Sequence, residues 1–474
     1  HQKNLNIDID CYDYVLPTSF CPPSPNDSYD TLNLTICDSI VSVTGKIFTS
    51  VGVYYDTIPN SLGFDSILVY NLSATFLSSS QIQKIVGGDR ETFDRFGASV
   101  SISGTYAAIG AYLEDEDTSG TNVLYQAGSV YLFEKNSSGV WLEKQKLVAS
   151  DRGTGDNFGS SVSISGNYLV VGAYQEDEDT LGTNNLISAG SAYVFERNVS
   201  GVWVEKQKLV ASDRGAYDKF GFSVSISGNE LIIGANQEDE DTSGLNTLSE
   251  AGSAYVFERN GSGVWVETQK LIASDRSADD NFGISVSISG KKIVIGAYQE
   301  DEDTSGLNTF NSAGSAYIFE KNSGGIWIET QKLVASDRGA SDKFGREVSI
   351  SDNYLVIGAP SDGEDASGSN FLSFAGSAYV FERNGNGIWI ERQKIVASDR
   401  GSQDYFGISV SISGDNIFVG ADGEEEDVFG MNTLAFAGSA YIFKLNFISS
   451  ILDSTIVFAC DSFVSHNGDV LKTS

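Results

Sequence analysis

The sequence predicts an all-β fold, a closed six-bladed β-propeller of four-stranded antiparallel blades with a small flanking β module. Two sets of residues recur at intervals of 62 residues, and the apolar residues between them alternate as they do in strands. The Phe-Gly dipeptides begin at Phe96, Phe158, Phe220, Phe282, Phe344 and Phe406, and the five tryptophans are Trp141, Trp203, Trp265, Trp327 and Trp389. Because the interval never changes, each unit is one copy of one supersecondary structure.

The second unit shows why each copy is a blade. Its first strand alternates Val162 and Ile164 with serines, and a Gly-Asn turn leads into the continuous apolar run 168–172, which is typical of a strand buried on both faces. After a polar loop, 191–197 and 202–210 supply two more strands. Four antiparallel strands per unit are the blade of a propeller.

The two ends of the array indicate the number of blades. The sixth unit ends after 438–443 and lacks the strand that carries Trp-x-x-x-Gln-Lys in the other units. The matching segment instead precedes the first unit at 83–86, aligned with 145–148. We therefore expect this N-terminal strand to complete the last blade and close a ring of six, with seven blades as the alternative.

The flanking segments predict four parts in the chain. These are an N-terminal segment (1–29), a small β module (30–80), the propeller (81–450) and the start of a second copy of the small module (451–474). The last assignment rests on Cys37-Asp-Ser, which returns at Cys460-Asp-Ser. Cys11 and Cys21 are close enough in sequence to close a small loop, and we expect a disulfide between them. Disulfides indicate an extracellular location.

Composition excludes several classes of function. With 64 acidic against 30 basic residues, the chain has a net charge of -34 and would repel nucleic acid. The only two histidines lie near the ends of the chain, which excludes a histidine-based triad or zinc site in the repeats. No apolar run is long enough for a membrane-spanning helix. We expect a protein that is not an enzyme.

Acidic runs between the second and third strands predict calcium sites. Oxygens at alternate positions followed by a glycine are what a calcium loop presents, since Ca²⁺ takes six to eight hard oxygen ligands. The expected ligands are Asp115, Asp117, Ser119, Asp177, Asp179, Asp239, Asp241, Ser243, Glu250, Asp301, Asp303, Ser305, Asp365, Glu425 and Asp427. The alternative is a solvated acidic surface that keeps the chain soluble.

Two further repeated features have a structural and a functional interpretation. Asp151 and Asp156, with Arg152 after the first, recur in every unit, so they predict turn-forming residues that accept backbone N–H groups rather than a single acid–base pair. Tyr112, Tyr174 and Tyr298 follow the second strand in three units. They are candidate platforms for stacking sugars, although packing is the simpler interpretation.

The motifs carry a resemblance to a known family. Phe158-Gly159 and Val171-Gly172-Ala173, with their equivalents, resemble the FG-GAP repeat of integrin α-chain propellers and of bacterial surface proteins. Integrin blades hold a calcium loop, Asp-x-Asp-x-Asp-Gly, between the first two strands, where this chain has Ser165-Gly166-Asn167. The resemblance therefore implies the fold and an extracellular role, and it does not carry over the integrin calcium site.

The flanks resemble the short β modules of giant surface proteins of Bacteroidetes, including gliding adhesins and other cargo of type IX secretion. The resemblance implies a segment of a large calcium-stabilised adhesin that attaches cells to a cell-surface or polysaccharide ligand. One alternative is a subunit of an extracellular filament, assembled from copies of itself through the terminal modules. Another is a carbohydrate-binding or carbohydrate-active propeller.

Overall fold

A computed structural model describes residues 83, 85–89, 91, 93–425 and 438–445, together with the backbone of eight short strands nearer the two ends. The chain divides into two compact units, Gln81–Phe443 on one side and His1–Ser80 with Lys444–Ser474 on the other. The expected disulfide between Cys11 and Cys21 lies outside the described residues.

The terminal unit contains one mixed sheet and two short hairpins. Its strands are β1 (Lys3–Ile7), β2 (Tyr29–Thr35), β3 (Ile40–Val41), β4 (Ile47–Phe48), β5 (Gly52–Pro59), β6 (Asp65–Ser73), β30 (Phe463–Val464) and β31 (Val470–Leu471). The sheet order is β1-β2-β6-β5, with β2 parallel to both β1 and β6, and β5 antiparallel to β6.

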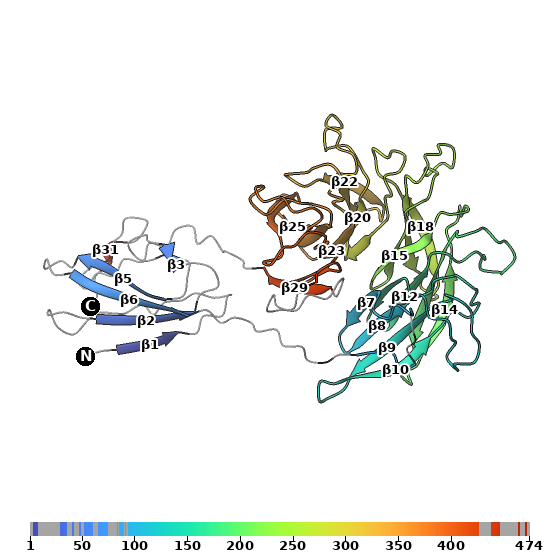
Figure 1. The fold of residues 1–474 in the computed structure, drawn as a ribbon, viewed down its shortest axis with the longest axis horizontal. Helices are drawn as coiled ribbons and strands as arrows, with labels where there is room; N and C mark the ends of the chain where they lie inside the picture. Colours follow the sequence, from blue (N-terminus) through green and yellow to red (C-terminus); the bar gives the residue numbers. More distant parts are fainter. Residues whose placement is uncertain are drawn as a thin grey trace. The chain divides into compact units, whose positions relative to one another are not determined.

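The larger unit is a propeller of six blades (Figure 1). Its strands are β7 (Ser99–Ser103), β8 (Tyr106–Ala111), β9 (Ser129–Lys135), β10 (Trp141–Leu147), β11 (Ser161–Ser165), β12 (Tyr168–Ala173), β13 (Ser191–Arg197), β14 (Trp203–Leu209), β15 (Phe220–Ser227), β16 (Glu230–Ala235), β17 (Ser253–Arg259), β18 (Trp265–Leu271), β19 (Val286–Ser289), β20 (Lys292–Ala297), β21 (Ser315–Lys321), β22 (Trp327–Leu333), β23 (Glu347–Ser351), β24 (Tyr354–Ala359), β25 (Ser377–Arg383), β26 (Trp389–Ile395), β27 (Ser409–Ser413), β28 (Asn416–Ala421) and β29 (Ser439–Lys444). Five sheets have four antiparallel strands, and three strands of the sixth are described. The prediction of an all-β, six-bladed propeller is confirmed.

The first strand of each blade lies nearest the propeller axis, because first strands of consecutive blades are neighbours. Serine side chains connect them: the Ser101 hydroxyl accepts the Ile164 N–H at 3.1 Å, and the Ser161 hydroxyl donates to the Gly221 carbonyl at 2.9 Å. The second strand is enclosed on both sides, so that Val170 is fully buried. This explains why first strands alternate serine with apolar residues whereas second strands are continuously apolar.

The Phe-Gly dipeptide packs against the preceding blade and forms a hydrogen bond with it. Phe158 is fully buried, and its ring lies edge-on to Tyr193 at 5.4 Å between centroids. Its N–H donates to the Ala127 carbonyl of the preceding blade at 3.0 Å. There the backbone of Gly128 passes so close that a Cβ atom would lie 2.0 Å from the Phe158 carbonyl oxygen, which only glycine permits. The Phe-Gly dipeptide is therefore part of the packing between blades.

At the first blade, Gln83 makes the contacts that the fourth strand of the preceding blade makes at other junctions. The Gln83 side-chain amide makes two 2.8 Å hydrogen bonds with the backbone of Trp141, as Gln145 does with Trp203 one blade further on. This is the place expected for the strand that closes the ring.

The junction between the sixth and first blades nevertheless exposes apolar side chains. Val100 is 68% exposed and Phe418 is 48% exposed, whereas the equivalent Val162 and Val356 of other blades are buried. Within the described residues, β29 is also the edge strand of its sheet. Pairing of β29 with the N-terminal strand therefore stays a prediction.

Candidate functional site

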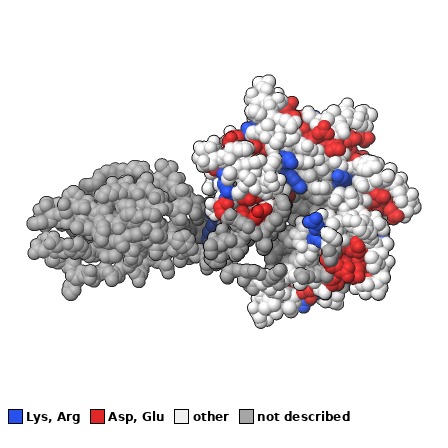
Figure 2. All heavy atoms as spheres, in the orientation of Figure 1, with Lys and Arg blue, Asp and Glu red and all other residues white. Residues whose placement is uncertain are grey.

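The acidic runs lie on one face of the propeller, which we call the loop face. It comprises the loops between second and third strands and the connections from each blade to the next, in the first blade 112–128 and 148–160. Antiparallel strands bring these segments to the same end of the sheet, and the N–H of Gly155 donates to the Tyr125 carbonyl at 2.9 Å. Figure 2 shows acidic side chains spread widely over the visible surface of the propeller.

Beneath the loop face, the first five blades contain the same buried polar network of a tyrosine, a lysine and two carboxylates, and the described part of the sixth blade repeats the tyrosine contacts. In the third blade the Tyr255 hydroxyl lies 2.8 Å from Asp213 and 2.9 Å from Glu238. The Lys270 ammonium lies 2.7 Å from Asp213 and 3.4 Å from Glu238, which is only 2% exposed. The same tyrosine contacts recur at Tyr131, Tyr193, Tyr317, Tyr379 and Tyr441.

A second buried carboxyl group completes this network. Asp218 accepts the Gly215 N–H, which confirms the predicted turn role, and its carboxyl is also hydrogen-bonded to that of Glu238. Burial, followed by the charge of Glu238, raises the pKa of Asp218 to about 8. The pKa is raised to about 8 in the same way at Asp156 and Asp280. At neutral pH each of these pairs therefore retains one proton.

Sequence reasoning missed the buried glutamate of each network. Glu238 is the first acid of its run, and the repeat places an acid at this position in all six blades. A signal was present, because this position follows the buried second strand by only three residues, closer to the core than the acids that come after it. The sequence also did not predict the contacts of the arginine that recurs in each connection. Arg214 donates to the backbone carbonyls of Asp177 and Asn184 and so holds the acidic loop of the preceding blade.

The second aspartate of the predicted calcium motif forms a turn with its own loop. Asp117 accepts the Ser119 N–H at 2.9 Å, the Ser119 hydroxyl at 2.7 Å and the Thr121 N–H at 3.3 Å. These hydrogen bonds lower the pKa of Asp117 to about 2. Asp179, Asp241, Asp303 and Asp365 are held in the same way, and Ser243 and Ser305 are donors like Ser119.

The first aspartate of the motif closes the other end of the loop. Asp115 accepts the Gln126 N–H at 2.6 Å, and Asp239 accepts the N–H of Glu250 at 2.7 Å. Asp177 and Asp301 make the equivalent bonds. Glu425 is exposed, and Asp427 lies outside the described residues. Turn-forming hydrogen bonds thus account for the spacing of these acids, and calcium at these residues stays a prediction.

The described residues bring together a different acidic group in the third blade. Single carboxylate oxygens of Asp213, Glu238 and Glu240 lie within 4.8 Å of one another. Three carboxylates are suitable donors for Ca²⁺. The Lys270 ammonium already contacts two of them, so a bound ion would share their charge with this lysine.

Nearer the axis, the loop face carries a set of positions at which the blades differ from one another, which we call the axial collar. Each blade contributes the residue after Gly-Ala at the end of its second strand, and two residues that flank the Phe-Gly dipeptide of the following blade. The collar consists of Tyr112, Tyr174, Asn236, Tyr298, Pro360 and Asp422, with Arg95, Asn157, Lys219, Asn281, Lys343 and Tyr405, and with Ala98, Ser160, Phe222, Ile284, Arg346 and Ile408.

The three tyrosines named by the sequence all lie in this collar. Tyr174 packs edge-on against Phe222 at 5.3 Å between centroids, and Lys219 lies 6.0 Å from its ring. The Tyr112 carbonyl accepts the Asn157 side-chain amide at 3.3 Å. All three tyrosines are half-buried, so each contacts the next blade as packing predicts. Sugar stacking on them stays a prediction.

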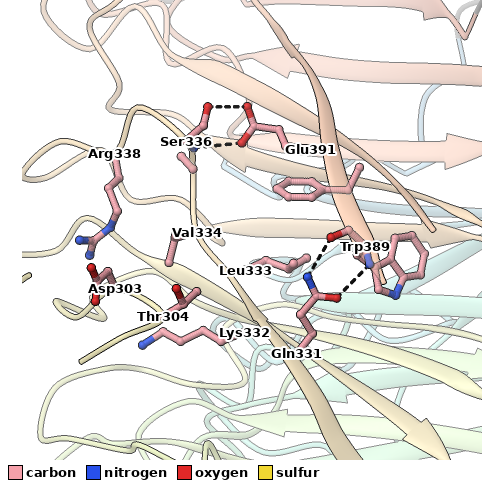
Figure 3. Close-up of a pocket in the computed structure, with 12 residues that line it drawn as sticks. Asp303, Thr304, Gln331, Lys332, Leu333, Val334, Ser336, Arg338, Trp389 and Glu391 are labelled. Carbon is pink, nitrogen blue, oxygen red and sulfur yellow. Dashed lines mark hydrogen bonds between the residues drawn. The ribbon is translucent and has the colours of Figure 1, made fainter. Parts of the chain in front are cut away.

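A groove of about 430 Å³ between the fourth and fifth blades is formed by structural contacts (Figure 3). Gln331 bonds the backbone of Trp389 at 2.8 and 2.9 Å, and Glu391 accepts the N–H and hydroxyl of Ser336 at 3.0 and 2.7 Å. The same pairs occur at other junctions, for example between Gln207 and the backbone of Trp265. The groove is therefore a product of blade packing.

Comparison with known proteins agrees with this architecture. A family model described as the FG-GAP repeat matches six stretches, 79–133, 141–195, 203–257, 265–319, 327–381 and 389–443. From the second stretch onward, each begins at the fourth strand of one blade and ends within the third strand of the next. No curated protein matches the chain. Among the described residues, no helix is long and apolar enough to cross a membrane.

Proposed function

The chain belongs to the FG-GAP repeat family, and from this premise we propose that it is an extracellular, non-enzymatic segment of a large adhesin that attaches cells to a surface or polysaccharide ligand. The observation that carries the proposal is the distribution of differences between blades. The tyrosine–carboxylate contacts repeat in all six blades, whereas the axial collar, most of whose residues are exposed or half-buried, varies from blade to blade on one face. Such a distribution favours a rigid platform with a binding surface.

A binding role is favoured over catalysis by the symmetry of the titratable groups. The carboxyls whose pKa is most raised, Asp156, Asp218 and Asp280, occupy equivalent buried networks and are at most 6% exposed. An active site needs groups that reach a substrate, and it normally occurs once in a chain. The repeated Cys-Asp-Ser flanks support the further proposal of a Bacteroidetes surface protein exported by type IX secretion.

Attachment of beads under flow tests the adhesive role. Latex beads carrying the chain, and control beads carrying albumin, are passed over glass coated with a branched polysaccharide whose side chains end in an acidic sugar, with neutral dextran or with nothing. We expect the chain to hold beads on at least one polysaccharide at a shear that removes the albumin beads. Equal detachment from all three surfaces would contradict the proposal.

We propose that Ca²⁺ stabilises the propeller through Asp213, Glu238 and Glu240. The support is the closeness of their oxygens, within 4.8 Å, and the excess of negative charge around them. An ion bound only by the folded state raises the melting temperature by mass action. We expect millimolar Ca²⁺ to raise it and Glu240→Gln to reduce the rise, while Asp117→Asn has no effect on it. An unchanged melting temperature in Ca²⁺ and in chelator would refute a stabilising ion.

Assembly into a filament is a second candidate, favoured by one observation. Within the described residues β29 is an edge strand, and the exposed Phe418 lies in the strand beside it. An unpaired edge is a template for a strand from another chain. Size-exclusion chromatography over a hundredfold range of concentration checks this: a filament subunit gives larger species as concentration rises, and a constant monomer refutes the candidate.

A further inference from the structure

We propose that the axial collar between the fourth and fifth blades binds the carboxylate of an acidic sugar, through Tyr298, Lys343 and Arg346. The inference rests on the proposed binding function and specifies its ligand. Tyr298 is the first residue after β20, while Lys343 and Arg346 flank the Phe-Gly dipeptide of the next blade. The Lys343 ammonium lies 5.9 Å and the Arg346 guanidinium 5.8 Å from the centre of the Tyr298 ring.

The three side chains together offer donors that no group of the described chain uses. Neither Lys343 nor Arg346 forms an ion pair among the described residues, and the Tyr298 hydroxyl makes no hydrogen bond there. All three are half-buried and still reach solvent. Burial raises the pKa of Tyr298, so its hydroxyl keeps its proton and can donate. A guanidinium, an ammonium and a phenol around one ring form a set suited to an oxyanion.

Two nearby carboxyl groups, Glu347 and Glu250, compensate the positive charge of this site only in part. Glu347 follows Arg346 directly, but it accepts the Ser285 hydroxyl at 3.0 Å. Burial raises the pKa of Glu347 to about 7, against the opposing effect of the Arg346 charge, so Glu347 is only partly ionised at neutral pH and compensates Arg346 only in part. Glu250, on the loop of the third blade, raises the pKa of Tyr298 through its charge, and it lies beyond ion-pair distance of both cations. Two cations beside the same ring repel each other, and a bound oxyanion would offset this repulsion.

The repeats indicate that this pair of cations is not needed by the fold. At the position of Arg346 no other blade has a charged residue, and two have Ile284 and Ile408. At the position of Lys343 two blades have Asn157 and Asn281, although a cation also occurs there at Arg95 and Lys219. The dipeptide Arg346-Glu347 occurs in the fifth blade alone, within a segment otherwise shared by all blades. A departure from symmetry that adds charge on an exposed face is the signature of a binding site rather than of packing.

The surrounding charge restricts the kind of ligand. The acidic loops outside the collar repel an extended polyanion, since the chain carries a net charge of -34. A sugar presents one carboxylate beside a flat, largely uncharged ring, which suits the two cations and the partly exposed tyrosine. The site therefore fits an acidic residue in a short or terminal stretch of glycan.

The repeats also supply variants that keep the fold. Arg346→Ile with Lys343→Asn installs residues that equivalent blades already contain. Lys291→Asn is the matched control, because it removes a charge at a turn on the opposite face where other blades have Asn167, Asn229 and Asn353. Binding of tetragalacturonate, of a sulfated tetrasaccharide, of neutral maltotetraose and of an acidic tetrapeptide is measured by isothermal titration calorimetry.

We expect tetragalacturonate to bind the intact chain, and the double variant to weaken this binding at least tenfold while Lys291→Asn changes it less than twofold. Maltotetraose should not bind. Absence of tetragalacturonate binding, or equal binding by the double variant, would overturn the site. Tighter binding of the sulfated sugar or the peptide would overturn the carboxylate sugar as ligand. If the double variant still holds beads, the adhesive function does not depend on this site. If the intact chain binds tetragalacturonate but holds no beads, the site stands and the adhesive function is overturned.

Discussion

Raising the pH from 5 to 8 should destabilise the propeller, and Asp218→Asn should weaken this dependence. In the folded chain the buried carboxyl pair of Asp218 and Glu238 holds a proton up to a pKa of about 8. An unfolded aspartate loses its proton near pH 4. Between these values the folded state binds the additional proton, so each rise in pH shifts the equilibrium towards the unfolded chain. The stabilisation is complete below pH 4 and is lost as the pH passes through 8.

The expected size follows from proton linkage. One proton held only by the folded state changes the free energy of unfolding by about 1.4 kcal/mol per pH unit. Asp156, Asp218 and Asp280 have the same raised pKa of about 8, so the three pairs together give about 4 kcal/mol per pH unit as an upper value. Asp218→Asn keeps an acceptor for the Gly215 N–H and removes one of the three contributions.

Urea denaturation at pH 5, 6, 7 and 8, followed by tryptophan fluorescence, measures this slope. We expect the free energy of unfolding of the wild-type chain to fall steadily with pH, and the fall to be about one third smaller in Asp218→Asn. Asp241→Asn is the control, because it removes the same charge from an exposed loop carboxylate whose pKa is lowered. A wild-type stability that is constant or rises between pH 5 and 8 would refute a shared proton in the buried pairs.

Three other substitutions test the packing of the blades. Gly190→Ala would place a Cβ atom 2.0 Å from the Phe220 carbonyl oxygen at a φ of +83°. We expect this substitution to lower the free energy of unfolding, measured in urea, by at least about 2 kcal/mol. Gly201→Ala is the control, because Gly201 has the same φ and no atom lies within 4 Å of the added Cβ. Phe418→Ala tests ring closure: a closed ring buries this side chain, so the substitution should cost about 3 kcal/mol, and a cost below about 0.5 kcal/mol would show that the junction stays open. Glu347→Ser restores the residue of the other five blades. Because burial raises the pKa of Glu347 to about 7, this substitution should increase the free energy of unfolding at pH 8 and leave it nearly unchanged at pH 5, as measured in urea.

The architecture could be predicted from the sequence because the same strand and turn patterns occur in six copies. A Phe-Gly dipeptide at a constant interval, a serine-alternating strand and a continuous apolar strand each have one physical interpretation, and all agree. The candidate site was harder to predict, because an acidic run looks alike whether its carboxylates bind an ion or their own backbone. Asp117 is held by Ser119 and Thr121 through short-range turn geometry. The pairing of Asp218 with Glu238 joins residues from two different connections, and their spacing in sequence contains no sign of that contact.

In a repeat protein, identity between blades and difference between blades carry separate information. Residues that recur from unit to unit, such as the tyrosine, lysine and acids of the buried network, have the same contacts in each of the first five blades and are sufficiently explained by packing. A residue such as Arg346 cannot be explained in that way, because four other blades pack well with a serine, a phenylalanine or an isoleucine in its place. Its presence needs a cause outside the blade. We therefore expect ligand contact at the cluster of such residues around the axis rather than at the acidic loops, although those loops carry much of the negative charge of the chain.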